Sequence, residues 1–212
     1  MERKKRDSFS LSQLAKNFHI EVVSKCTTLD EWLSAIYELN PNETELLNTI
    51  FAKVQTDGNY WNEEELKIQL IGFLFFIANI DTKGKIKVFY ERPLAAEVES
   101  YNLSVVVDCL VATPLPFHTP ESPYFFLQEY KKGRGDDKDP EAQMLTAMLI
   151  AQELNKDNKP IFGSYLFGSR WKFCTLVGKN YCQSPEFDAD KYPDLLQIVF
   201  IIRKLKELIL NR

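Results

Sequence analysis

Two carboxylates and an ammonium group occupy strand-like segments in which folding alone would favour apolar side chains. Asp108 ends the apolar run LSVVV, and Glu129 and Lys131 lie within a second run, YFFLQEYKK. Residues two apart on a strand share a face, so Glu129 and Lys131 are predicted to point the same way, together with Phe125 and Leu127. If the two strands pair, Asp108 can meet them.

Two carboxylates placed this close together favour the binding of a cation. Two carboxylates a few ångström apart repel each other unless a positive charge lies between them. Hard oxygen ligands of this kind suit Mg²⁺ or Mn²⁺. The residue types therefore predict a divalent-cation site formed by Asp108 and Glu129, with Lys131 beside it.

The composition argues against several other kinds of site. The four cysteines show no C-x-x-C spacing and the only histidines are His19 and His118, so neither a Cys/His zinc site nor a Ser-His-Asp hydrolase is expected. No glycine-rich phosphate-binding loop occurs. The net charge of −4 argues against a protein that coats nucleic acid by bulk electrostatics, but it leaves room for a local grip on phosphate.

At 212 residues the chain suits one domain with a helical appendage. We expect a helical N-terminal extension over residues 1–60 and a main domain over residues 61–212. The longest apolar segment, residues 68–80, spans about 13 positions, fewer than the roughly 20 that cross a bilayer. The basic, polar start does not resemble a secretory signal. We therefore expect no membrane association, reduced cysteines and a cytoplasmic location.

The order of elements around the charged residues is helix, strand, strand, strand, helix, strand. Asn62 is a plausible N-cap for the first helix, and Pro93 is expected to stop the first strand. A helix is also predicted to start at Pro140. The expected segments are a helix at 62–80, strands at 85–93, around Val106 and at 123–132, a helix from 140, a hairpin at 160–168 and 170–177, and a final amphipathic helix from 192. Two N-terminal helices are predicted, one from Thr28 to position 39, stopped by Pro41, and one over 42–55.

Four segments carry a resemblance to a known family: EELKIQLI, FYERP, YFFLQEYKK with DPEAQML, and GSYLFGSRWKF. They resemble a group of uncharacterised bacterial proteins assigned to the PD-(D/E)XK, or restriction-endonuclease-like, nuclease superfamily, and the resemblance covers residues 62–177. It implies a mixed α/β (α+β) restriction-endonuclease-like core. It also implies Mg²⁺-dependent (or Mn²⁺-dependent) hydrolysis of phosphodiester bonds in nucleic acid, DNA rather than RNA.

The resemblance also assigns roles at the site. Asp108 would be the central metal ligand, Glu129 the second, and the carbonyl of Tyr130 a third oxygen. Lys131 would orient the attacking water and counter charge on the phosphate.

Two further residues enter through the same resemblance. Glu65 of the first core helix would complete the metal site, with Glu63 as the alternative. Gln143 resembles a glutamine that many family members direct at the metal or at the nucleic acid backbone. Its neighbour Glu141 is expected to be solvated.

Plainer interpretations stay open. Asp108 can be a solvent-facing strand end, Glu129 and Lys131 an exposed ion pair, and the glutamates an acidic helix start. Lys132, Arg134 and Lys138 could meet phosphates, but the acidic residues among them favour a solvated loop.

Two alternatives to a nuclease stand beside the leading hypothesis. The first is a catalytically silent relative that serves as a nucleic-acid or protein-binding module. The second is a toxin, defence or mobile-element component that recruits a partner through its N-terminal segment. The terminal helices could also support a homodimer or another protein contact.

Overall fold

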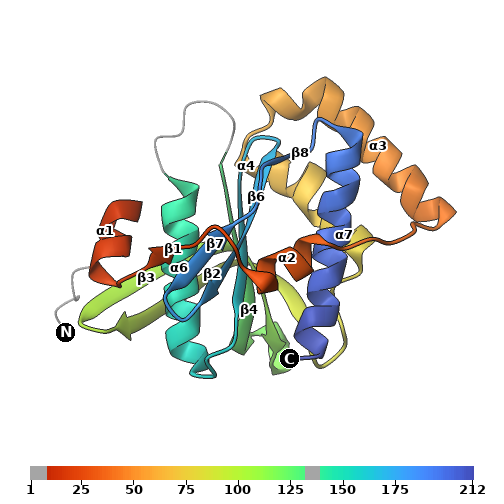
Figure 1. The fold of residues 1–212 in the computed structure, drawn as a ribbon. Coiled ribbons are helices and arrows are strands. Elements are labelled where there is room, and N and C mark those ends of the chain that lie inside the picture. The colour runs from red at the N-terminus through yellow and green to blue at the C-terminus, as the bar shows by residue number, and fades with distance from the viewer. Residues whose placement is uncertain (1–8, 132–138) are drawn as a thin grey trace.

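A mixed β-sheet runs through the centre of the molecule, with helices on both of its faces (Figure 1). The computed structural model describes residues 9–131 and 139–212. The spatial order of the strands is β1-β7-β6-β5-β4-β3-β2, and β8 pairs with β6 off this path. The predicted mixed α/β class is confirmed.

The strands are β1 (Glu21–Val22), β2 (Lys87–Val98), β3 (Tyr101–Pro114), β4 (Pro120–Lys131), β5 (Ile161–Phe167), β6 (Arg170–Val177), β7 (Asn180–Gln183) and β8 (Phe187–Asp188). The α-helices are α1 (Leu11–Asn17), α2 (Thr27–Leu33), α3 (Pro41–Asp57), α4 (Glu63–Leu66), α5 (Gly72–Ala78), α6 (Pro140–Asn155) and α7 (Tyr192–Leu210). A π-helical stretch, η2 (Lys67–Ile71), joins α4 to α5, and short 3₁₀ turns lie at η1 (Gly58–Tyr60) and η3 (Pro116–His118).

The elements around the charged residues follow the predicted order. The helix begins after Asn62, whose side chain accepts a hydrogen bond from the Glu65 backbone, and it ends at Asn79 in the left-handed conformation. Strands β2, β3 and β4 then form an antiparallel set. Helix α6 follows β4 in the sequence, and the next strand, β5, pairs with β4 in parallel.

The sequence predicted that Pro93 stops the first strand, and this prediction is wrong. β2 continues through it to Val98, and Pro93 lies opposite Val106 of β3. The reason is that β2 is an edge strand of the sheet. A proline lacks the N–H that would bind a further strand, and the described residues place no strand on the outer side of β2, so the missing donor costs little there.

The N-terminal helices also differ from the prediction. Helix α2 starts at Thr27 with Cys26 as its N-cap and ends at Leu33, so neither the Thr28 cap nor the extension to residue 39 is found. Pro41 begins α3 instead of stopping the preceding helix, because Asn40 caps it and a proline suits the first helical position. Helix α1 and strand β1 were not predicted.

Two apolar layers hold the helices on the sheet. Helices α2, α3, α5 and α7 pack on one face around Trp32, Leu74 and Ile202. Helices α1 and α6 cover the other face (Figure 1). Leu14, Met148 and other buried side chains form the apolar layer there. Within the part of the chain that the structure describes, no helix has both the length and the apolar character to cross a bilayer.

Candidate functional site

The antiparallel register of β3 and β4 brings Asp108 next to Glu129. Cys109 lies opposite Gln128 in this ladder, so the next step along both strands places Asp108 beside Glu129. The backbone N–H of Tyr130 donates to Asp108 Oδ2 over 3.0 Å. The two carboxylates that the sequence singled out therefore meet on adjacent central strands.

Lys131 lies at the same place. Its Nζ donates to the Tyr130 carbonyl oxygen over 3.1 Å, and the charge of Asp108 acts on it. Burial alone would lower the pKa of Lys131, but the charges of Asp108 and Glu63 raise it above its usual value. The side chain is therefore an ammonium at neutral pH.

One predicted neighbour does not share this face. Leu127 belongs to the core layer under α6, as expected, but Phe125 belongs to the opposite layer together with Phe126. The cause is an irregularity in the β3–β4 register between Val111 and Ala112, which places an extra residue in β4. A β-bulge of this kind breaks the period of two on which the prediction rested.

Glu129 carries the unusual feature of the site. It is 1% exposed, and apart from the neighbouring Asp108 neither of its carboxylate oxygens has a hydrogen-bond partner among the described residues. Burial, and then the charge of Asp108, raise the pKa of Glu129 well above its usual range, and Lys131 only partly opposes them. A buried charge without partners is costly in a folded protein, so this carboxylate needs an explanation outside folding.

Asp108 is less isolated. Burial raises its pKa, while the Tyr130 N–H and the charge of Lys131 act in the opposite direction. The charge of Glu91 adds to the increase. Both acids of the pair thus bind protons more tightly than free carboxyl groups do, as close carboxylates without a cation should.

Glu63, the alternative in the sequence analysis, reaches the site, and Glu65 serves the helix. Glu63 Oε1 lies 3.4 Å from Lys131 Nζ. Glu65 accepts from the backbone N–H of Asn62 over 2.8 Å and completes a capping box at the start of α4. The carboxylate of Glu65 is therefore committed to the cap, and the structure favours Glu63 as the helical contributor.

A second ion-paired group borders the site, and the sequence analysis missed it. Lys67 Nζ lies 2.7 Å from Glu64 and 2.8 Å from Glu91. Glu91 sits within β2 at the level of Asp108, yet its φ is 51°. Residues other than glycine rarely adopt this region, and such strain concentrates at functional sites. The sequence offered no signal, because Glu91 reads as an ordinary strand residue.

Gln143 and Glu141 lie in the first turns of α6. Gln143 is half-buried, and its Oε1 is buried without a partner among the described residues, so its predicted role stays a prediction. Glu141 is not solvated as expected. It accepts hydrogen bonds from the hydroxyls of Tyr165 and Tyr181 and from the amide of Gln183.

The remaining sequence predictions fall outside or beside this site. Lys132, Arg134 and Lys138 lie outside the described residues. Asp139 caps α6 by accepting from the backbone of Glu141 and Ala142.

The oxygen ligands at this site are of the kind that a hard divalent cation prefers, but there are few of them. Asp108 and Glu129 offer carboxylate oxygens, two of them unpartnered, and the Tyr130 carbonyl is close by. Within residues 9–131 and 139–212, no group of three or more His, Cys, Asp or Glu side chains is arranged to hold a metal. Mg²⁺ commonly takes one or two carboxylates and completes its shell with water and substrate phosphate, so two carboxylates fit that mode.

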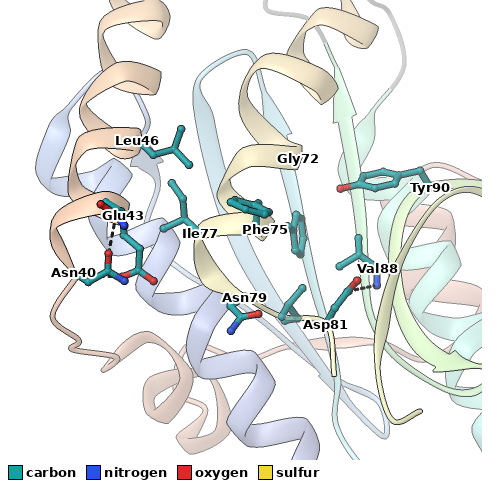
Figure 2. Close-up of a pocket in the computed structure, with 13 residues that line it drawn as sticks. Asn40, Glu43, Leu46, Gly72, Phe75, Ile77, Asn79, Asp81, Val88 and Tyr90 are labelled. Carbon is teal, nitrogen blue, oxygen red and sulfur yellow. Dashed lines mark hydrogen bonds between the residues drawn. The ribbon is translucent and has the colours of Figure 1, made fainter. Parts of the chain in front are cut away.

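A separate hollow lies on the other face of the sheet. It has a volume of about 670 Å³ and is bounded by α3, α5 and β2. Figure 2 shows Glu43 of α3 facing Phe75 and Ile77 of α5, with Val88 and Tyr90 of β2 on the far side. None of the buried polar atoms that lack partners among the described residues belongs to its lining.

Comparisons with family models and with curated proteins found no match to this chain.

Proposed function

We propose that this protein is a metal-dependent phosphodiesterase that hydrolyses nucleic acid, DNA in preference to RNA, with Asp108, Glu129 and Lys131 at its centre. The observation that carries the proposal is the buried carboxylate of Glu129, which among the described residues has only Asp108 as a hydrogen-bonding neighbour. A cation between the two would relieve their repulsion and coordinate the buried carboxylate oxygens. The resemblance of the surrounding segments to PD-(D/E)XK nucleases points to the same chemistry.

Each residue has a task that its position supports. Asp108 and Glu129 would hold Mg²⁺ or Mn²⁺, and the ion when bound would polarise the phosphate and acidify a water molecule. The Tyr130 N–H fixes one oxygen of Asp108, which leaves the other free to bind. The raised pKa of Lys131 keeps it protonated, so it would stabilise negative charge on the attacking oxygen or the phosphate and would not act as a base.

Glu63 has a positioning role in this scheme. Glu63 belongs to helix α4, and its carboxylate oxygen lies 3.4 Å from Lys131 Nζ. This residue would therefore orient the ammonium group of Lys131 without touching the substrate. Removal of Glu63 should therefore reduce the rate less than removal of Lys131.

The cleavage experiment uses the full chain with supercoiled plasmid DNA, linear duplex, single-stranded DNA and RNA, each with Mg²⁺ or Mn²⁺. We expect metal-dependent cleavage of DNA that stops with a chelator and falls by about a hundredfold or more in Asp108→Asn. Glu45→Gln, an exposed acid on α3, is the matched control and should cleave as the wild type does. Equal rates for wild type and Asp108→Asn would overturn the proposal.

A binding module without catalysis is the second candidate. The specific observation in its favour is that the described residues hold no group of three metal-ligating side chains. Calorimetric titration with Mg²⁺ and Mn²⁺ separates the two. Because Glu129 has a raised pKa, metal binding at this site should release a proton and tighten as pH rises. Absence of Asp108-dependent metal binding, combined with retained nucleic-acid binding, would favour the module.

A further inference from the structure

Two cysteines that are far apart in sequence meet on the face of the sheet opposite Asp108 and Glu129. Cys182 of β7 is 2% exposed and belongs to the core layer under α2, α3, α5 and α7. Cys26, directly before α2, is partly exposed and packs against the same layer. Neither residue has a part in the proposed hydrolysis.

Strand pairing fixes their approach. Val22 of β1 pairs with Tyr181 of β7, and the Val23 N–H donates to the Tyr181 carbonyl over 3.0 Å. Three residues later, Cys26 Sγ lies 3.4 Å from Thr175 Oγ1. Thr175 and Cys182 are cross-strand partners in β6 and β7, so their side chains stand side by side on one face. Both thiols therefore lie next to the hydroxyl group of Thr175.

The two thiols differ in acidity. Burial disfavours the Cys26 thiolate, but the Thr175 hydroxyl 3.4 Å away, and next to it the Cys182 thiol and the backbone N–H groups of Leu29 and Thr28, lower its pKa below the usual value. Burial and the hydrogen bond to Cys26 raise the pKa of Cys182 to about 12. The thiolate is the reactive form of cysteine, so the partly exposed member of the pair is also the better nucleophile.

We propose that Cys26 and Cys182 form a redox-active pair that reacts with hydroperoxides, with Cys26 as the nucleophile and Cys182 as the resolving thiol. The Cys26 thiolate attacks a peroxide oxygen, the O–O bond breaks, and Cys26 sulfenic acid and hydroxide (or alkoxide) form. The Cys182 sulfur then displaces the hydroxyl of the sulfenic acid as its own proton leaves, which yields the disulfide and water. The peroxide gains two electrons and the two thiols lose them.

The disulfide would join the segment before α2 to β7. This bond would add a covalent restraint next to the point where the two-residue strand β1 pairs with β7. A thiol reductant would release it. The proposal stands apart from the proposed nuclease activity, so either can fail without the other.

The decisive experiment maps the thiols of the full chain after treatment with hydrogen peroxide. Free thiols are then blocked, the protein is digested without reduction, and the peptides are identified by mass spectrometry. We expect a Cys26–Cys182 linked peptide that dithiothreitol removes and that Cys26→Ser and Cys182→Ser both lack. Cys174→Ser is the matched control, because Cys174 is buried in the other core layer, and it should keep the linked peptide.

Two further readouts keep the test independent of folding defects. In Cys182→Ser the sulfenic acid at Cys26 should persist and be trapped by dimedone. In Thr175→Val, which preserves shape, the Cys26 pKa should rise, so its alkylation by iodoacetamide at pH 7 should slow by about threefold and should match the wild type at high pH. Circular dichroism of each variant reports whether the fold is retained. A wild-type protein that forms no Cys26–Cys182 peptide, or in which peroxide takes Cys26 to sulfinic acid without a disulfide, would overturn the proposal.

Discussion

The carboxylate site and the hollow between α3, α5 and β2 differ in how their polar groups are satisfied. In the hollow, Glu43 pairs with Arg203 over 2.9 Å and caps α3 through Asn40, and Asp81 accepts from the Val88 N–H over 2.8 Å. At the carboxylate site, both oxygens of the buried Glu129 are unpartnered among the described residues. The acidic groups of the hollow have hydrogen-bond and ion-pair partners, whereas the oxygens of Glu129 lack them among the described residues apart from Asp108.

The unsatisfied carboxylate, and not the larger hollow, is the feature that indicates chemistry in this molecule. A hollow of about 670 Å³ can arise wherever three elements meet imperfectly, and its lining groups here already stabilise the fold. An unpaired buried carboxylate opposes folding and persists only if something else requires it. We therefore assign function to the tight region.

The largest expected effect is on catalysis. Glu129→Gln should reduce metal-dependent DNA cleavage by about a hundredfold or more, because it removes a charge that would hold the cation. Phe76→Ala, which alters an exposed side chain of the hollow, should leave the rate within about twofold, since it changes nothing near the reacting atoms. The measurement is the initial rate of plasmid nicking. Equal losses in both variants would break the comparison.

The second effect is on stability, and its sign should differ between the regions. Glu129→Leu should raise the free energy of unfolding at pH 8 without metal by about 1 to 3 kcal/mol, because it removes a buried carboxyl group whose ionisation is opposed by burial and by Asp108. Glu43→Leu should lower it by about 1 to 2 kcal/mol, because it breaks a cap and an ion pair. Urea denaturation of both variants gives the two values. A loss in Glu129→Leu would show that this carboxylate stabilises the fold.

The third effect is the pH dependence of the free energy of unfolding, which the ionisation of Glu129 should control. The folded-state pKa of Glu129 lies above the value of about 4.3 expected in the unfolded chain, so the folded state holds its proton to higher pH. Wild-type stability should then fall as pH rises from the unfolded value through the raised folded value. Glu129→Leu should lose part of this slope, and Asp108, whose pKa is also raised, should supply the rest.

Urea titrations from pH 4 to pH 8 without metal measure this slope. Saturating Mg²⁺ should restore wild-type stability at pH 8 and leave Glu129→Leu nearly unchanged. Parallel curves for the two proteins across this range would contradict the assigned pKa direction.

The smallest effect separates Glu63 from Glu65. Glu63→Gln should reduce the cleavage rate by about tenfold with little change in stability, since it touches the ammonium of Lys131 from outside the reacting groups. Glu65→Gln should do less to the rate and should lower stability by about 0.5 kcal/mol through the weakened cap. Thermal unfolding and the nicking assay together distinguish them. A reversal of the two patterns would return Glu65 to the site.

The sequence predicted those elements correctly whose position depends on local signals in the chain. Helix α6 starts at Pro140, and the order of elements from Asn62 to Phe167 follows the predicted one, because caps, proline positions and alternating apolar residues are local signals. Pro93 misled the prediction because its effect depends on whether its strand is central or at an edge. Phe125 misled it because a bulge in the ladder is a property of two strands together.

The residue order alone was enough to predict that Asp108, Glu129 and Lys131 are unusual in apolar strands and would share a face if the strands paired, because side-chain direction in a strand alternates with a period of two. Three features became visible only in the folded chain: Glu63 and not Glu65 contacts Lys131, Glu91 adopts a left-handed conformation at the level of Asp108, and Cys26 approaches Cys182. Each of these depends on how segments distant in the chain are placed against one another, and no local pattern of residues encodes that placement.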